Sequence, residues 1–176
     1  MNPPTGSGFV GILSSGGAFA ALKADGTITS WGNSDFGGTG APTDSGYAQI
    51  SSTGSAFVGV KPDGSLKSWG YSLCGGLGAP TGNGFTKVFS TGGAFAAIKT
   101  DGSITTWGLD WAGGTGGPTG TGFVQIISNY NAFAGIRSDG SVYTWGGQGG
   151  GGGGNSSAVS GQLTSGVVSV SSVLEQ

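Results

Sequence analysis

The chain has 176 residues, 42 of them glycine, and its six basic and eight acidic side chains leave a net charge of −2. Six basic residues spread over this length form no positive patch, which argues against nucleic acid as a partner. No apolar run approaches the ~18 residues of a membrane-spanning helix. Nine Phe, five Trp and four Tyr are more aromatic residues than a disordered glycine-rich segment carries, and they indicate a folded chain.

A 38-residue repeat organises the sequence. Five markers recur at this spacing: Pro4, Pro42, Pro80 and Pro118; Gly8, Gly46, Gly84 and Gly122; Phe19, Phe57, Phe95 and Phe133; Asp25, Asp63, Asp101 and Asp139; and Trp31, Trp69, Trp107 and Trp145. Independent markers in one register indicate tandem structural repeats. We expect a single repeat domain over 1–176, with repeats at 8–45, 46–83, 84–121 and 122–165. The last repeat is degenerate after residue 146 and contains a glycine run at 149–154.

Each repeat is predicted to hold three strands, read from β-branched and aromatic residues between turn signals. In the fourth repeat these strands fall at 123–128, 132–137 and 141–145. A [Lys/Arg]-x-Asp-Gly sequence joins the last two, and it predicts a type I turn followed by a glycine in the left-handed conformation. The glycine-rich segment after each Trp-Gly is interpreted as a loop or a short irregular fourth strand, and no helix is expected. Residues 166–173 resemble the first strand of a fifth repeat.

The most regular polar feature is a cation and an acid at each predicted hairpin turn: Lys23/Asp25, Lys61/Asp63, Lys99/Asp101 and Arg137/Asp139. Two interpretations are open. The four carboxylates form a ring around an axis, or each Asp caps its own turn through local hydrogen bonds. Because the spacing follows the Asp-Gly turn, we favour capping.

The predicted third strand carries Ile28 and Trp31 at positions of opposite parity, so that they point to opposite faces of a flat sheet. The second strand, 18–22, is apolar nearly throughout. Both features predict sheets that are covered on both faces, with aromatic side chains filling the spaces between them. The predicted fold class is therefore all-β, a β-propeller with blades of about 38 residues. A β-solenoid is the alternative, but its shorter coils need no hairpin turn in every repeat.

The string Ala-Phe-x-x-[Ile/Leu/Val]-Lys-x-Asp-Gly-[Ser/Thr]-[Ile/Leu/Val]-x-x-Trp-Gly-x4-Gly-Gly occurs at 18–38, 56–76 and 94–114. It resembles the repeat of the RCC1-like superfamily, which includes regulator of chromosome condensation and beta-lactamase inhibitor protein II. The short repeat and the Pro-Thr linker are closer to the inhibitor branch. The resemblance implies a closed seven-bladed propeller that binds other proteins through loops on one face. Four repeats are fewer than seven, so we expect a piece of a longer array, or copies that associate, for example two chains in an eight-bladed ring.

Positions that vary while the repeat around them stays constant are the candidates for function. They follow each Trp-Gly or precede each second strand, and bulky side chains there are placed to contact a partner. The candidate partner-binding residues are Phe36, Tyr71, Leu73, Asp110, Trp111 and Tyr130. Alternatively, the aromatic residues among them shield the edges of neighbouring blades.

The sequence offers no catalytic, cofactor-binding or metal-binding constellation. It contains no histidine, and its one cysteine, Cys74, has no basic neighbour to activate the thiol. We therefore expect a non-catalytic module without cofactors that binds a protein partner, with further repeats or a second copy completing the ring. The alternative is a structural or adhesive segment of a larger secreted or cell-surface protein, a location that the weakly charged Gly/Ser/Thr-rich composition favours.

Overall fold

A computed structural model describes residues 3–147 and Val167. The glycine run at 149–154, the end of the fourth repeat and all but Val167 of the predicted strand at 166–173 lie outside the described residues. The chain divides into two compact units, Met1–Phe85 and Thr86–Gln176.

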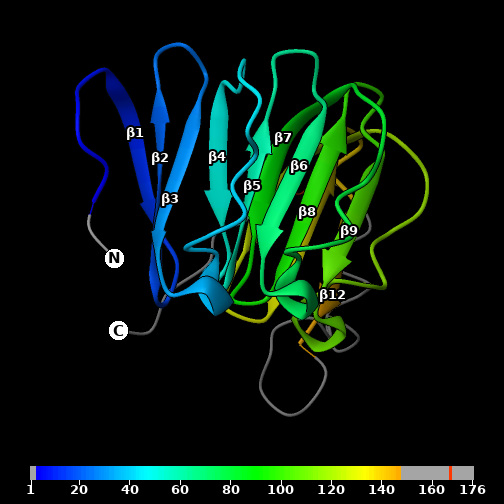
Figure 1. Cartoon of the computed structure of the whole chain (residues 1–176). Helices are drawn as coiled ribbons and strands as arrows, with labels where there is room; N and C mark the ends of the chain where they lie inside the picture. Colours follow the sequence, from blue (N-terminus) through cyan, green and yellow to red (C-terminus); the bar gives the residue numbers. More distant parts are fainter. Residues whose placement is uncertain (1–2, 148–166, 168–176) are drawn as a thin grey trace. The chain divides into compact units, whose positions relative to one another are not determined.

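Each of the four repeats forms one three-stranded antiparallel sheet, whose strands are ordered as they follow in the sequence (Figure 1). The sheets comprise β1 Phe9–Ser14, β2 Ala18–Lys23 and β3 Ile28–Gly32; β4 Gln49–Ser52, β5 Ala56–Val60 and β6 Leu66–Gly70; β7 Phe85–Ser90, β8 Ala94–Lys99 and β9 Ile104–Gly108; and β10 Phe123–Ser128, β11 Ala132–Arg137 and β12 Val142–Gly146. The strands β10 and β11 coincide with the predicted ones, and β12 begins one residue later than predicted. Antiparallel pairing within each repeat excludes the β-solenoid, whose strands pair in parallel with the next coil.

The hairpin turn between the second and third strands has the predicted geometry. In the second repeat the Gly64 N–H donates to the Lys61 carbonyl at 2.9 Å, and Gly64 has a φ of 81°, the left-handed conformation that completes this turn. Asp63 Oδ1 accepts from the Ser65 N–H at 2.9 Å. The same bond to the Asp carboxylate recurs in the other three repeats, so the prediction that each Asp caps its own turn is confirmed.

Three short 3-10 turns within residues 3–147 show that the expectation of no helix is wrong. They are η1 Ser34–Phe36, η2 Ser72–Cys74 and η3 Asp110–Ala112, each one residue after a Trp-Gly. The first glycine of the following Gly-Gly pair ends each turn, with φ values of 87°, 91° and 92° at Gly37, Gly75 and Gly113. A left-handed glycine is a common helix terminator. The Gly-Gly pair therefore marks the end of a helical turn, and the residues after it form a loop.

Each sheet has two different faces, which we name by their residues. The aromatic face carries the Phe of the second strand and the Trp of the third, which are cross-strand neighbours. In the second sheet these are Phe57 and Trp69, stacked with ring centroids 5.4 Å apart, and the pair recurs in the other sheets. The alanine face carries the alternate residues of the second strand, Ala18 and Ala20 in the first sheet.

Within each unit, the aromatic face of the later sheet packs on the alanine face of the earlier one. The first core contains Ala18, Ala20, Leu22 and Ile28 from the first sheet, with Phe57 and Trp69 from the second and Tyr47 from the segment preceding β4. The second core contains Ala94, Ala96 and Ile98 from the third sheet, with Ile126, Phe133 and Trp145 from the fourth. Full burial of a Phe side chain stabilises the fold by roughly 2–3 kcal/mol. Ile28 lies in the first core while Trp31 lies on the other face of the same sheet, as their parity predicts.

Replacing Gly64 with Ala tests the hairpin turn. An added Cβ would lie 2.4 Å from the Phe85 amide nitrogen, in addition to the strain of the left-handed φ. We expect Gly64→Ala to lower the free energy of unfolding by about 3 kcal/mol or more. Gly46→Ala is the matched control, because Gly46 has a φ of 87° with open space around it, and it should cost only about 1 kcal/mol. Urea denaturation followed by circular dichroism measures both, and equal losses would contradict this account.

Candidate binding surface at the loop end

Two segments meet at one end of each sheet, which we call the loop end. One segment is the turn between the first and second strands, and the other is the 3-10 turn with the residue before it. In the first three sheets these pairs are 15–17 with 33–36, 53–55 with 71–74, and 91–93 with 109–112. In the fourth sheet the turn between the first and second strands is 129–131. Backbone hydrogen bonds of 2.9 Å join the segments, from Asn33 N–H to the Gly17 carbonyl, Tyr71 N–H to Ser55 and Leu109 N–H to Gly93. All six candidate residues lie at loop ends, three in each unit.

A hydroxyl group holds each 3-10 turn against its sheet. The Oγ1 of Thr91, which is buried, accepts from the Ala94 N–H at 3.0 Å and donates to the Ala112 carbonyl at 2.9 Å. Thr53 makes the same two bonds in the second repeat, and Ser15 makes them in the first. Because these bonds involve only backbone partners, the side chains of the 3-10 turn are free to vary without loss of the frame.

Neighbouring loop ends within one unit are also bonded. In the first unit the Gly16 N–H donates to the Gly54 carbonyl at 2.7 Å, and in the second unit the Gly92 N–H donates to the Tyr130 carbonyl at 2.7 Å. The candidate side chains are therefore presented on bonded turns.

In the first unit, Tyr71 and Leu73 are 45% and 58% exposed, whereas Phe36 is half-buried and packs against the core. A Cβ added to Gly17 would lie 3.0 Å from the Phe36 ring, and the equivalent Cβ on Gly93 would lie 2.7 Å from Leu109 instead. Phe36 in the first repeat and Leu109 in the third thus cover the same turn from different positions. For Phe36 the observed packing corresponds to the shielding alternative.

In the second unit, Trp111 and Tyr130 are 43% and 68% exposed, and Asp110 is exposed as well. The Tyr130 ring stands over Gly92, where an added Cβ would lie 2.8 Å from its carbons. Asp110 and Trp111 border a cavity of about 480 Å³, whose other lining residues are Thr115, Gly116, Thr144, Trp145 and Gly146.

Leu77 is a further exposed apolar residue that the sequence reasoning missed. It is 69% exposed in the loop after η2, and the equivalent residues of the first and third repeats are Thr39 and Thr115. The sequence feature that could have identified Leu77 is an apolar residue at a position where the neighbouring repeats have threonine.

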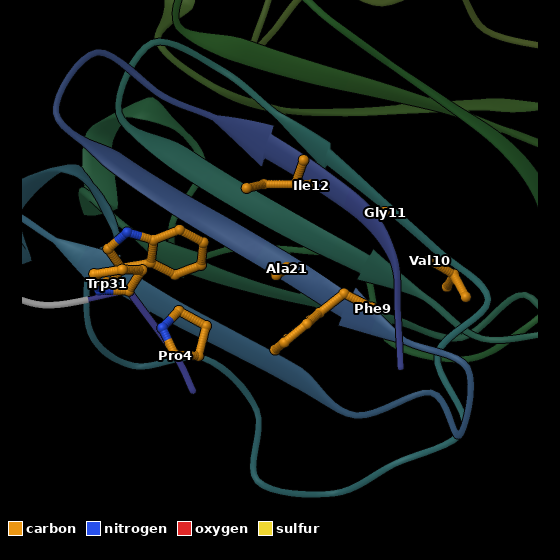
Figure 2. A pocket seen from close by; sticks show the side chains of 8 residues that line it. Pro4, Phe9, Val10, Gly11, Ile12, Ala21 and Trp31 are labelled. Atoms are coloured by element: carbon orange, nitrogen blue, oxygen red, sulfur yellow. The ribbon is translucent and has the colours of Figure 1, made fainter. Parts of the chain in front are cut away.

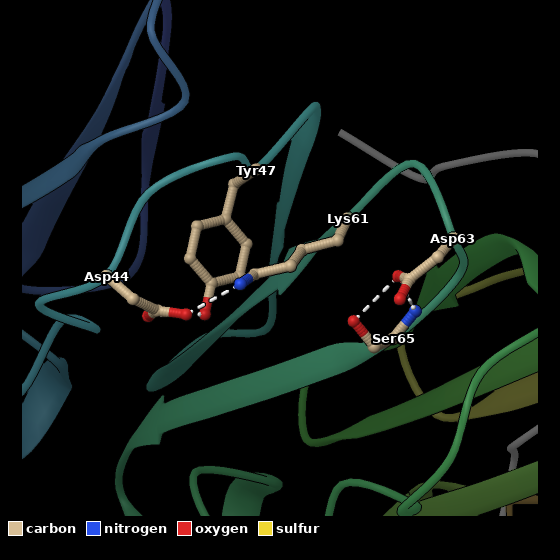
Figure 3. A network of polar contacts seen from close by, with 5 residues as sticks. All are labelled: Asp44, Tyr47, Lys61, Asp63 and Ser65. Carbon is tan, nitrogen blue, oxygen red and sulfur yellow. Dashed lines mark hydrogen bonds and ion pairs between the residues drawn. The ribbon is translucent and has the colours of Figure 1, made fainter.

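At the opposite end of the sheets, three of the turn cations lie over the first aromatic residue of their repeat. Lys61 Nζ donates to Asp44 Oδ2 at 2.6 Å and lies 5.0 Å from the centre of the Tyr47 ring (Figure 3). Lys23 and Arg137 lie over Phe9 and Phe123 at 5.2 and 4.6 Å. Each of these three cations thus makes a cation–π contact with the aromatic residue at the start of its repeat.

The contacts of Asp44 and Tyr47 shift the pKa values of both residues. The hydrogen bond from Lys61, followed by that from the Tyr47 hydroxyl, lowers the pKa of Asp44. Burial, together with the Asp44 carboxylate, raises the pKa of Tyr47 to about 12. At neutral pH Asp44 is therefore ionised and Tyr47 is protonated. The network is a structural contact between the hairpin turn and the loop that precedes β4.

Cys74 is buried, and burial raises the pKa of its thiol, which disfavours the thiolate that nucleophilic chemistry requires. Among the described residues, no three His, Cys, Asp or Glu side chains gather as a metal site would require. Over the same residues, no helix has the length and apolar character needed to cross a lipid bilayer.

Solved structures with the same arrangement of sheets identify the fold. The entire ectodomain of the Physcomitrella patens receptor kinase CR4 matches with a TM-score of 0.61 at 20% identity, over 82% of this chain and 42% of that chain. Prp20p from Saccharomyces cerevisiae, bound to Kap60 as yeast RCC1, matches with a TM-score of 0.58 at 16% identity, over 85% and 48%. The CRINKLY WD40 ectodomain of the Arabidopsis thaliana receptor kinase ACR4 matches with a TM-score of 0.58 at 22% identity, over 78% and 53%.

The chain has the fold of an RCC1-like β-propeller. It spans about half the length of these three structures. No protein-family model and no curated protein sequence matches it, so its likeness to the RCC1-like propellers is one of fold. The expected β-propeller fold is confirmed by these structures.

Replacing Thr91 tests whether the buried hydroxyl holds the third loop end. We expect Thr91→Val to lower the free energy of unfolding by about 2 kcal/mol, because the Ala112 carbonyl and the Ala94 N–H lose a partner in a buried place. Thr91→Ser is the matched control, since Ser15 fills this role in the first repeat, and it should retain most of the stability. Thermal unfolding measures both variants, and an equal loss in the two would show that the methyl group matters rather than the hydroxyl.

The network in Figure 3 predicts a pH effect. We expect Lys61→Met to raise the pKa of Asp44 towards its ordinary value, and Lys67→Met, which removes an exposed lysine of β6, to leave it unchanged. Because the folded-state pKa of Asp44 is lowered, the interaction stabilises above the ordinary pKa of Asp and is lost as the pH falls through the folded value. Carbon-detected NMR titration of the Asp44 carboxyl measures the shift. An unchanged pKa in Lys61→Met would refute this contact.

Proposed function

We propose that this chain is a non-catalytic protein-binding module of the RCC1-like propeller type, which contacts its partner through the loop ends. The observation that carries the proposal is the exposure of large apolar side chains at those ends: Tyr71 at 45%, Leu73 at 58%, Trp111 at 43% and Tyr130 at 68%. Exposed aromatic residues on a fixed frame are typical of binding hot spots.

The hydrogen bonds of the frame support this role. A rigid loop loses little conformational freedom when it binds, so more of its contact energy appears as affinity. Few charged side chains accompany the aromatic ones at the loop ends, and Asp35 and Asp110 are the acids there. We therefore propose that the partner presents a weakly charged, largely apolar surface. Phe36 contributes through the position of its turn rather than through direct contact.

Similar folds also support a protein partner. Prp20p is described with its binding properties to Gsp1p and histones, and yeast RCC1 is bound to Kap60. These partners belong to those proteins, but they illustrate that an RCC1-like propeller presents surfaces suited to proteins. We carry over only that class of partner.

We further propose that the repeat boundaries 8–45, 46–83, 84–121 and 122–165 delimit the blades and that 166–173 starts a fifth. Support comes from Val167, whose N–H donates to the Gly140 carbonyl at 3.2 Å. The first aromatic residues of the second and fourth repeats, Tyr47 and Phe123, donate in the same way to Gly26 and Gly102. This bond supports a further blade that begins near Val167.

A photo-crosslinking experiment tests the proposed binding surface. A photoreactive amino acid at Leu73 should give crosslinks to a partner protein in an extract of the source cells, and the partner is then purified. With the purified partner, we expect Tyr71→Ala and Trp111→Ala each to weaken binding by about 30-fold, as hot-spot residues do. Isothermal titration calorimetry measures the affinities.

Tyr143→Ala is the matched control for these variants. Tyr143 is 39% exposed, close to the exposure of Tyr71, but lies in β12 away from the loop end, where it contacts Arg137 and Phe123. Binding should survive this replacement. Unchanged affinity in both loop-end variants, or a comparable loss in Tyr143→Ala, would refute the loop end as the binding surface.

A further inference from the structure

The aromatic face of the first sheet is exposed, although the same face of the later sheets is buried. Phe19 is 45% exposed, whereas its counterparts are 0 to 1% exposed: Phe57, Phe95 and Phe133. Ile12 is 62% exposed, whereas Ile126, its counterpart in the fourth repeat, is 2% exposed. The repeat itself thus supplies the comparison, and it shows that residue type does not account for the difference.

This face contains an apolar hollow. Figure 2 shows Ile12 and Phe9 on β1, Ala21 on β2 and Trp31 on β3 around a cavity of about 460 Å³, with Pro4 beside the Trp31 ring. The other lining residues are Pro3, Val10 and Gly11. None of the lining side chains is charged. Exposed apolar surface of this kind is costly in water and typically marks a contact with another surface.

The chain contains two examples of what covers such a face. In the first unit the aromatic face with Phe57 and Trp69 is covered by an alanine face, that of Ala18 and Ala20. In the second unit, Phe133 is covered in the same way, by Ala94 and Ala96. The surface that fits the exposed face is therefore the alanine face of another sheet of this repeat.

An incompletely covered alanine face exists in the fourth sheet. Ala134 is half-buried, whereas the residues at its position in the other sheets are 0% exposed: Ala20, Val58 and Ala96. Val167 lies at the far end of this face, and a cavity of about 360 Å³ lined by Val124 and Ile136 remains beside it. The equivalent residue in the other repeats is an aromatic ring, which is larger than Val167 and would fill this space.

We propose that the aromatic face of the first sheet docks on the alanine face of the fourth sheet of a second copy of this chain. Phe9 of one copy then takes the position now held by Val167 of the other, and Ile12 and Phe19 cover Ala134. The two faces differ, so the contact is head-to-tail: it closes into a ring or extends into a chain of copies. This surface is separate from the loop end.

Light scattering on the full chain over a range of concentrations tests the proposal. We expect masses at multiples of the 17.0 kDa chain as concentration rises. Ile12→Asp, which would bury an unpaired carboxylate in the contact, should weaken association by about 100-fold or more. Leu77→Asp is the matched control, with the same change of charge at an exposed apolar residue. Leu77 is 69% exposed in the loop after η2 and lies on neither docking face, so this change should leave association unaltered.

Complementation decides the geometry of the contact. Ala134→Lys should block the alanine face and, like Ile12→Asp, give a monomer with an unchanged circular dichroism spectrum. An equimolar mixture of the two variants should recover a dimer, because one intact aromatic face then meets one intact alanine face. Association lost in Ile12→Asp but retained in Ala134→Lys would mean that two aromatic faces meet, which overturns the proposal. A monomeric wild-type chain at all concentrations would overturn it as well.

Replacing Val167 tests the competition for the Gly140 carbonyl. Val167→Pro removes the N–H that donates to this carbonyl and should strengthen association severalfold by freeing the position for Phe9 of the second copy. Weaker association in this variant would show that the residues around Val167 form part of the contact, and the proposed placement of Phe9 would be wrong.

Discussion

The packing of an aromatic face on an alanine face is the interaction on which the rest of this structure depends. A three-stranded sheet satisfies its inner hydrogen bonds by itself, but it cannot bury a stacked Phe–Trp pair on its own surface. Only a second sheet does that, and it needs small side chains at alternate positions to accept the rings, as Ala18 and Ala20 do for Phe57 and Trp69. Stability is therefore shared between neighbouring sheets, as in other repeat proteins.

The packing between sheets explains which positions of the repeat are constant and which vary. The aromatic rings, the small residues, the capping Asp and the Gly-Gly pair serve the frame, and each has a fixed place in the repeat. The loop end is held through backbone carbonyls and one hydroxyl, so it places few demands on its side chains. One requirement remains, which is that an apolar side chain covers the glycine-containing turn before the second strand. Phe36 and Leu109 each do this from a different position of their repeat.

Local features of the fold could be predicted from the sequence, and contacts between strands largely could not. The Asp-Gly turn is defined within four residues, so its type and its capping bond follow from residue identity. The 3-10 turns were missed because a Gly-Gly pair suits a loop as well as a helix end, and only the φ of Gly37 separates the two. The cation over Phe9 was missed because it depends on the pairing of Phe9 with Lys23 across two strands.

The same reasoning separates the two surfaces of this protein. At the loop end, Tyr71 and Trp111 are exposed, and the hydrogen bonds that hold their turns do not involve their side chains. These two side chains are therefore not needed for the packing of the sheets. On the first sheet, Phe19 and Ile12 belong to the frame itself. The counterparts of Phe19 in the second and fourth sheets, Phe57 and Phe133, are buried against the alanine face of the preceding sheet. One surface presents variable residues and the other presents the exposed aromatic face of the first sheet. We therefore propose a partner of different sequence for the first surface and a second copy of the chain for the second.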